Sequence, residues 1–231
     1  MSYLLRTPLH YVCWLKLAKR CFTHYICRRF SDFLELGYNR PEINVCCIGG
    51  GSGSDLVGLC QFMDHYNIRT TKINAVILDY YDWSNETRNL LNNIPGCAEY
   101  GLHYFNYVQF DFYTSPITNE VILQIRNADL ITIVKFLSAV GVDDSYNFIQ
   151  LQVLLSHMKR NARVFFMDNS GGRFGEVMGN AAQSVGLELI CEVERKRISV
   201  CECEYEEMGN NRFQTLPQKT TSVSASLWKR N

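Results

Sequence analysis

A glycine-rich segment is the part of this sequence best suited to hold a ligand. Four of its five consecutive positions are glycine, namely Gly49, Gly50, Gly51 and Gly53. An apolar run over residues 43–48 precedes it, and an apolar-periodic stretch over 56–66 follows it. Glycine permits positive φ and lets a ligand lie against the main chain, and the free N–H groups at the start of a helix attract a phosphate or a carboxylate. We predict a strand, a ligand-binding loop and a helix, the alternative being a flexible turn with incidental glycines.

The spacing of the glycines narrows the choice of ligand. Gly49, Gly51 and Gly53 form G-x-G-x-G, whereas the dinucleotide fingerprint G-x-G-x-x-G requires glycine at the position of Ser54. The Walker A pattern also fails, because no Gly-Lys-Ser/Thr follows the loop. The pattern favours S-adenosylmethionine over NAD, and Asp55, which follows the loop directly, is included in the candidate site.

Acidic residues follow the next two predicted strands. Asp79 ends the apolar run 73–78, where its carboxylate can accept both ribose hydroxyls of an adenosine. Asp111, followed by Phe112, ends the third strand and is placed to accept a hydrogen bond from an adenine amino group. Tyr80 comes directly after Asp79 and can stack on adenine. The alternatives are that each Asp only forms a turn and that Tyr80 only packs at a helix start.

The elements that must position these residues alternate along the chain. Predicted strands cover 43–48, 73–78, 107–110, 130–136, 163–167 and 187–193, and predicted helices cover 56–66, 83–92, 146–158 and 174–185. This alternation predicts a doubly wound α/β domain over 41–231, with a mostly parallel sheet and helices on both faces. The run 221–228 alternates apolar and small polar residues, which suits an antiparallel strand. A helical extension is expected over 1–40.

With these motifs the sequence resembles the class I S-adenosylmethionine-dependent methyltransferases over residues 42–231. The resemblance rests on the loop 47–53, on Leu78-Asp79, on Asp111 and on 129–136 as the fourth strand. It implies a seven-stranded sheet with an antiparallel last strand, S-adenosylmethionine as cofactor and methyl transfer as the reaction. The segment 129–132 alone is also similar to the ribosomal-RNA uridine methyltransferases of fungi.

The resemblance also assigns roles to single positions. An acid usually stands two positions before the first loop glycine, where this chain has Cys47, and residues that face the methyl acceptor commonly follow the fourth strand, here Lys135 and Ser138. Alignment alone supplies much of the acceleration in methyl transfer. Lys135 can orient an anionic substrate or act as a base if burial lowers its pKa, the alternative being a lysine that merely reaches solvent.

The distribution of charge along the chain indicates what kind of molecule accepts the methyl group. Lys and Arg total 23 and Asp and Glu total 23, so a globally polybasic protein is excluded. Residues 1–40, however, carry seven basic side chains against two acidic ones, interleaved with aromatics, a pattern that can grip phosphates and stack bases. We therefore expect RNA as the acceptor, although a merely solvated helix face explains the charge equally simply. A small-molecule methyltransferase and an inactive methyltransferase-like interaction module are the alternatives.

The remaining expectations concern metals and membranes. The five histidines and ten cysteines show neither metal-ligand spacing nor a C-x-x-C pair, so no metal site is predicted. No apolar run approaches the roughly 18 residues of a membrane-spanning helix, and no export signal is evident. These features indicate a cytoplasmic or nuclear protein with reduced thiols.

Overall fold

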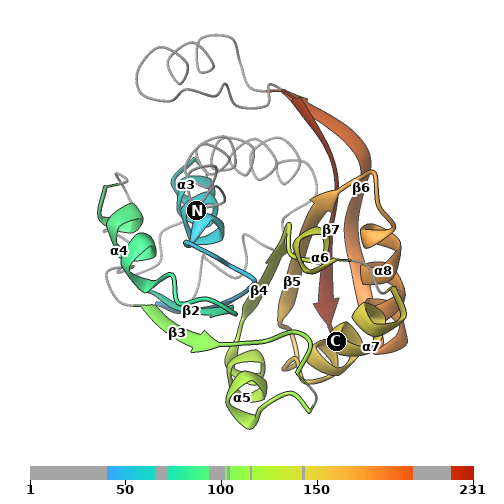
Figure 1. Cartoon of the computed structure of the whole chain (residues 1–231), viewed down its shortest axis with the longest axis horizontal. Helices are drawn as coiled ribbons and strands as arrows, with labels where there is room; N and C mark the ends of the chain where they lie inside the picture. The colour runs from blue at the N-terminus through green and yellow to red at the C-terminus, as the bar shows by residue number, and fades with distance from the viewer. Residues whose placement is uncertain are drawn as a thin grey trace.

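A seven-stranded sheet with helices on both faces forms the body of the protein, as seen in a computed structural model (Figure 1). The structure describes residues 41–65, 72–93, 102, 105–114, 116–141, 144–199 and 220–231. The predicted helical extension over 1–40 lies outside the described residues.

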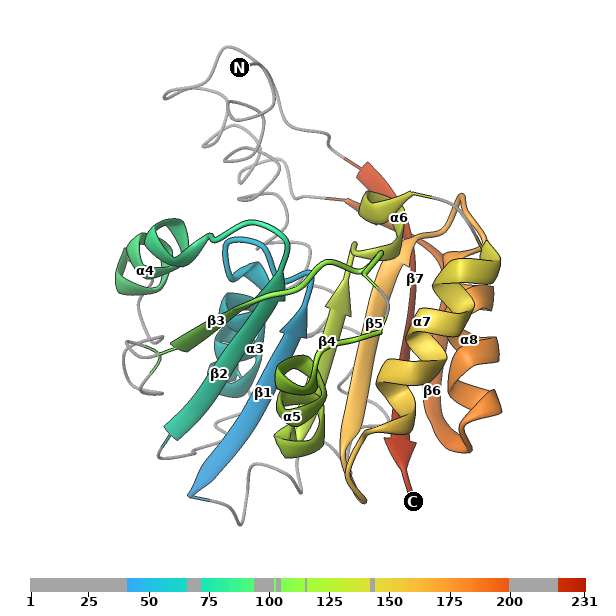
Figure 2. The same cartoon turned by 60° about the horizontal axis from the view of Figure 1, so that its bottom comes forward.

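The strand order places a switch point beside the glycine loop. The strands are β1 (Glu42–Ile48), β2 (Lys72–Asp79), β3 (Phe105–Gln109), β4 (Leu130–Val134), β5 (Arg163–Asn169), β6 (Leu187–Ser199) and β7 (Thr220–Arg230). Their order is β3-β2-β1-β4-β5-β7-β6, with β1 to β5 paired in parallel. Strand β7 runs antiparallel to both β5 and β6 (Figure 2), which confirms the predicted antiparallel last strand. The chain runs outward from β1 to β2 and β3 and then crosses back to β4 on the other side of β1. Such a switch point is where open α/β sheets bind ligands.

The helices cover the two faces of the sheet in two groups. They are α3 (Ser54–His65), α4 (Ser84–Asn93), α5 (Asn119–Asn127), α6 (Leu137–Val140), α7 (Asp144–Ser156) and α8 (Phe174–Ser184). Side chains of α3 and α4 pack with Val45 of β1 in one core, and those of α5, α7 and α8 pack with its neighbour Cys46 in the other. Both faces of β1 are therefore buried, which explains why its residues 45–48 are continuously apolar.

Several elements differ from the sequence-based boundaries, among them β4, β6 and α5. Strand β4 ends at Val134, not at residue 136, because Lys135 adopts φ +53°, which lies outside the range of strand residues. Strand β6 continues to Ser199, beyond residue 193. Helix α5 was not predicted, because only one narrow face of it is buried, through Val121 and Ile125.

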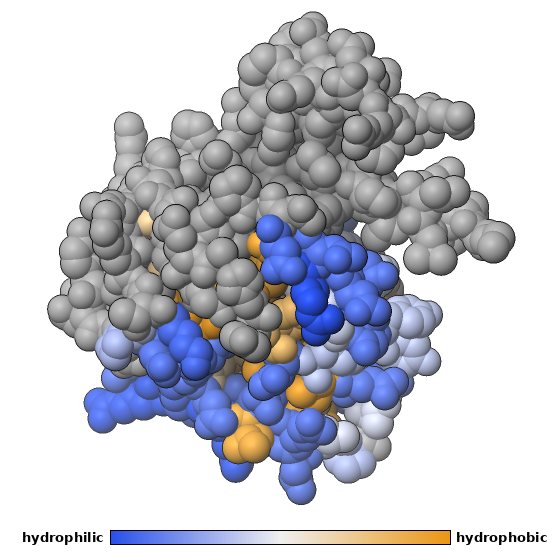
Figure 3. Space-filling model, turned by 90° about the vertical axis from the view of Figure 1, so that its left-hand side faces the viewer, coloured by the Kyte–Doolittle hydropathy of each residue, from blue (hydrophilic) through white to orange (hydrophobic). Residues whose placement is uncertain are grey.

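The described surface is mostly polar on the side shown in Figure 3. Hydrophilic side chains dominate there, with small hydrophobic areas between them. Within the described residues, no helix has the length and apolar character needed to cross a membrane.

Candidate functional site

A cavity of about 510 Å³ opens at the carboxyl ends of the first four strands. Each strand contributes the residue at its end or just beyond it: Gly49 after β1, Asp79 of β2, Asp111 after β3 and Lys135 after β4. Because the carboxyl ends of parallel strands meet at one edge of the sheet, four segments that lie far apart in the sequence form one wall.

The glycine loop is shaped by positive φ angles, which are +64° at Gly49, +50° at Gly51 and +86° at Gly53. A Cβ at Gly49 would lie 2.0 Å from Cδ2 of Phe136, so no other residue fits there without movement of that ring. A Cβ at Gly51 would meet nothing within 4 Å among the described atoms. The backbone at Gly51 therefore faces open space, as a ligand-binding loop requires.

Asp79 joins the end of β2 to this loop. Its Oδ2 accepts a hydrogen bond from the Gly51 N–H at 2.9 Å, and its Oδ1 accepts one from the Tyr81 N–H at 3.3 Å. The Tyr107 hydroxyl donates to the Asp79 carbonyl oxygen at 2.6 Å. Burial, together with the nearby Asp79 and Asp82 carboxylates, raises the pKa of Tyr107 to about 12, so this donor stays protonated. The carboxylate is held in place and keeps lone pairs for a ligand.

Asp111 forms a turn and also lines the cavity. Its Oδ1 accepts from the Tyr113 N–H at 2.9 Å and its Oδ2 from the Thr114 hydroxyl at 3.0 Å. Asp111 therefore does form a turn, as the alternative interpretation of the sequence predicted. The turn holds its carboxylate in the cavity lining. Next to it, Phe112 is buried and packs edge-to-face on Phe136, with ring centroids 5.0 Å apart. These rings give the cavity an apolar side.

Exposed tyrosines add aromatic surface to the cavity. Tyr80, Tyr81 and Tyr113 all line it, with 53%, 66% and 51% of their surface accessible to solvent. The Tyr80 and Tyr81 rings meet edge-to-face at 4.8 Å, and Tyr113 stacks on Tyr146 at 5.4 Å. Sequence reasoning missed Tyr113, although it lies only two positions after Asp111. The apolar and aromatic wall suits a planar group.

Lys135 stands at the border between the ends of β4 and β5. Its N–H donates to the Met167 carbonyl at 2.7 Å, and its ammonium donates to Oδ1 of Asn169. A positive φ at a residue with a Cβ is strained and is retained where the surroundings enforce it. The first contact fixes the Lys135 backbone, and the second holds its side chain at the β5 side of the cavity.

Ser138 does not line the cavity. Its N–H donates to Oδ2 of the buried Asp168 at 3.0 Å, and its hydroxyl donates to the Lys135 carbonyl at 3.4 Å. Asp168 also accepts from the Asn169 N–H at 2.7 Å. The structure thus places Ser138 behind Lys135, where it ties α6 to the end of β5.

Cys47 and Asp55 lie beneath the glycine loop, away from the cavity wall. The Cys47 side chain has no exposed surface, and burial raises the pKa of its thiol well above the usual range. Asp55 is 4% exposed, and its Oδ2 accepts a 2.6 Å hydrogen bond from the Thr132 hydroxyl on β4. Burial raises the pKa of Asp55 to about 7. These residues support the loop from below.

The structure therefore divides the predicted site residues into two groups. The cavity is lined by Gly49, Asp79, Tyr80, Asp111, Phe112 and Lys135. The others form the rest of the loop or lie beneath and behind it: Cys47, Gly50, Gly51, Gly53, Asp55 and Ser138. The first group can bind a ligand through side chains, and the second shapes the loop and the turn that carry it.

Comparisons with known proteins agree with this arrangement. A family model described as "Putative SAM-dependent methyltransferase" matches residues 15–135, just over half of the 231 residues. A SAM-dependent methyltransferase structure from Methanosarcina mazei matches with a TM-score of 0.55 at 8% identity, over 85% of this chain and 96% of that one. A precorrin-6y C5,15-methyltransferase structure from Geobacter metallireducens matches with a TM-score of 0.50 at 10% identity, over 86% of each chain. At these identities the structures show a shared fold. A search of curated proteins found no match.

Proposed function

Because the chain belongs to this family of SAM-dependent methyltransferases, we propose that S-adenosylmethionine binds in the cavity at the carboxyl ends of β1 to β4 and that RNA is the methyl acceptor. The contact of Asp79 with the Gly51 N–H carries the first part of the proposal. It brings together, in one wall, the carboxylate suited to ribose and the loop suited to the rest of the molecule.

The residues present fit the methyl donor. The open space over Gly51 leaves the loop backbone accessible, and Asp79 offers carboxylate oxygens to the ribose hydroxyls. Asp111 accepts a hydrogen bond from the adenine amino group, and Phe112 and Tyr80 give the adenine ring apolar surface. Fixed acceptors and rings of this kind bind a nucleoside without reorganisation.

The chemistry that the donor supplies is a methyl group on a sulfonium, which is already a good electrophile. The protein's contribution is therefore alignment of the acceptor in line with the methyl group. Lys135 and Asn169 lie together at the β5 side of the cavity, and the lysine ammonium orients an electron-rich acceptor oxygen or its neighbouring anionic group. Ser138 is a positioning residue, because it contacts the Lys135 carbonyl.

Two features favour RNA as the acceptor. The exposed rings of Tyr81 and Tyr113 lie beside the nucleoside site, where they can stack an unpaired base. The basic, aromatic-rich residues 1–40 supply charge for the phosphates.

The proposal is tested by incubating the full chain with S-adenosylmethionine labelled on its methyl group and with separated RNA, protein and metabolite fractions. We expect the label in RNA, and no label with K135M. Label that enters only the metabolite fraction would make the protein a small-molecule methyltransferase. Absence of transfer in all fractions would count against catalysis itself.

A further inference from the structure

A second cavity, of about 490 Å³, lies at the opposite end of the sheet. It is formed by the amino-terminal parts of β1, β2 and β3 and by the carboxyl end of α5. Strands β1 and β2 are 7 and 8 residues long. Its nearest lining residues on these strands, Cys46 and Val76, lie three positions before Gly49 and Asp79 of the first cavity, a separation of roughly 10 Å. The two cavities share no lining residue, so this one is separate from the proposed methyl-donor site.

Three asparagines make this end of the sheet unusual. Asn44, Asn74 and Asn106 line the cavity from three neighbouring strands, and Asn44 and Asn74 are register partners. Strands of a covered parallel sheet are normally continuous apolar runs, and asparagine is depleted in strands. These side chains add nothing to the apolar packing of the sheet, whereas they can offer a ligand both hydrogen-bond donors and acceptors.

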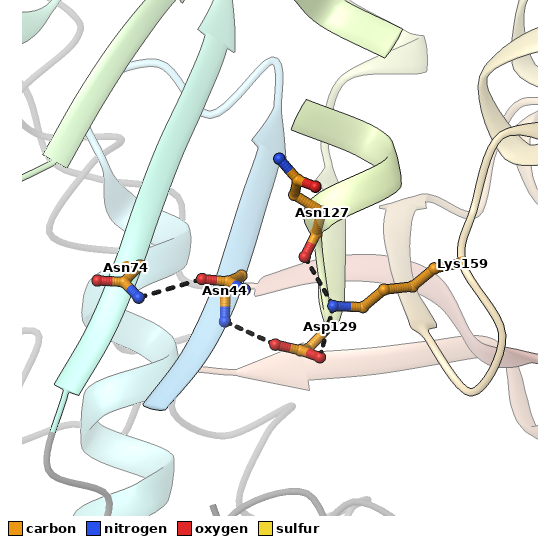
Figure 4. Close-up of polar contacts among 5 residues, drawn as sticks. All are labelled: Asn44, Asn74, Asn127, Asp129 and Lys159. Atoms are coloured by element: carbon orange, nitrogen blue, oxygen red, sulfur yellow. Dashed lines mark hydrogen bonds and ion pairs between the residues drawn. The ribbon is translucent and has the colours of Figure 1, made fainter. Parts of the chain in front are cut away.

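A hydrogen-bond network fixes the cavity wall (Figure 4). The Asn74 amide donates to Oδ1 of Asn44 at 3.1 Å, and the Asn44 N–H donates to Oδ2 of Asp129 at 2.9 Å. The Lys159 ammonium lies 2.8 Å from Oδ1 of Asp129 and donates to the Asn127 carbonyl at 2.7 Å. Asp129 is buried, and protein donors bind both of its carboxylate oxygens. Its charge is therefore directed into the network and not into the cavity.

The side chains that line the cavity are basic where they are charged. They include Lys72, Arg126 and Lys159, and among the described lining residues none is acidic. Glu42 approaches from the rim, where its Oε2 accepts from the Asn74 amide at 3.2 Å. Arg126 and Lys72 are exposed, so each can move toward a ligand.

Arg126 lies beside a histidine of the neighbouring helix end. Nη2 of Arg126 lies 3.4 Å from Nδ1 of His157. Burial and the Arg126 charge lower the pKa of His157, so the imidazole is neutral at pH 7 and can accept from the guanidinium. The pair orients Arg126 without cancelling its charge.

We propose that this cavity binds a phosphate group, with Lys72 and Arg126 as the cations and with Asn106 supplying amide hydrogen bonds. Guanidinium and ammonium groups next to amide donors are suited to a phosphate. The cavity is large enough for a nucleoside attached to that phosphate. The same chemistry is offered by a free nucleotide and by the backbone of an RNA chain. The site does not depend on the identity of the methyl acceptor.

The test uses calorimetry of the full chain with three probes: inorganic phosphate, AMP and a single-stranded oligouridylate. The double variant K72E/R126E should bind at least one of them about tenfold or more weakly than the natural chain, since two charge-assisted contacts are lost. The single variant R126E should also bind more weakly than the natural chain. The exposed Arg88, on helix α4 of the other face, gives its matched charge-reversal control R88E, which should bind as the natural chain does. Melting curves check that each variant is folded.

The three probes also identify the source of the phosphate. AMP that binds as tightly as the oligonucleotide indicates a nucleotide site. The slope of log affinity against log salt concentration reports how many counterions the oligonucleotide releases on binding. A slope that corresponds to about two fewer counterions in K72E/R126E than in the natural chain indicates an RNA backbone contact. In either case N106L, which removes an exposed amide of the cavity and keeps the side-chain size, should weaken binding severalfold while S-adenosylhomocysteine still binds. The proposal is overturned if no probe binds the natural chain, or if K72E/R126E loses no more affinity than R88E.

Discussion

The carboxylate of Asp79 and the backbone N–H of Gly51 lie 2.9 Å apart and form a hydrogen bond. Asp79 is the last residue of β2 and Gly51 follows β1, so the two residues come from neighbouring strands. Their contact joins Asp79 to the glycine loop, so a ligand that binds against this carboxylate also lies next to the loop.

Two glycines of this loop should respond differently to alanine. G49A places a Cβ 2.0 Å from the Phe136 ring and should lower the melting temperature strongly, since overpacking costs about 1–3 kcal/mol. G51A meets no described atom and should cost only the roughly 1 kcal/mol of a positive φ. It nevertheless adds a methyl group to the loop that we propose binds the methyl donor, so affinity for S-adenosylhomocysteine should fall. Melting curves and calorimetry on both variants measure this contrast, and equal affinities for G51A and the natural chain would contradict it.

Asp55 should make stability depend on pH. Its pKa is about 7 in the folded protein, against 3.8 for an aspartate side chain in water. Between these values the folded state binds more protons than the unfolded state, so stability falls as pH rises toward 7. Since one pKa unit corresponds to about 1.4 kcal/mol, the loss between pH 5 and pH 8 is about 3 kcal/mol at most.

The amide variant D55N removes this titration and should flatten the fall in stability, measured by urea unfolding at pH 5 and pH 8. E120Q makes the same chemical change at the exposed Glu120 and should leave the pH dependence as it is. A natural chain that is equally stable at both pH values, or a D55N variant with the same slope, would show that Asp55 is not a buried titrating group.

Lys135 offers a variant that separates catalysis from folding. K135G removes the strain of φ +53° and should raise stability by about 1 kcal/mol, whereas loss of the ammonium should lower the rate of methyl transfer at least about a hundredfold. Asn161 has φ +63° and is exposed, so N161G should be stabilised in the same way and remain fully active. Melting temperatures measure the change in stability, and single-turnover rates measure the change in methyl transfer. A K135G variant with the rate of the natural chain would show that Lys135 takes no part in the reaction.

The exposed tyrosines should affect acceptor binding more than donor binding. Y81A removes a ring that is 66% exposed and should weaken RNA binding by about 1–3 kcal/mol with little change in stability. Y81F keeps the ring and should bind RNA as the natural chain does. The measurement is RNA affinity by fluorescence anisotropy beside S-adenosylhomocysteine affinity by calorimetry. If Y81A binds RNA normally, Tyr81 does not stack a base.

The sequence predicted the parallel sheet and its antiparallel last strand. It also predicted that the candidate acids stand at the carboxyl ends of the second and third strands. These features follow from local patterns, because apolar runs mark the strands and Asp79 and Asp111 directly follow two of them. The sequence could not show that Asp55 binds Thr132, since that contact joins residues 77 positions apart. It also could not show that Cys47 lies under the loop, because the direction of a side chain in a strand covered on both faces is not encoded in its apolar pattern.

The most direct test of the account is calorimetry of S-adenosylhomocysteine with the natural chain, with D79A and with the exposed control E120A. The natural chain and E120A should bind alike, whereas D79A should lose about tenfold to a hundredfold or more in affinity because the ribose hydroxyls lose a charged acceptor. Binding that is absent from the natural chain, or unchanged in D79A, would contradict the assignment of the cavity to the methyl donor.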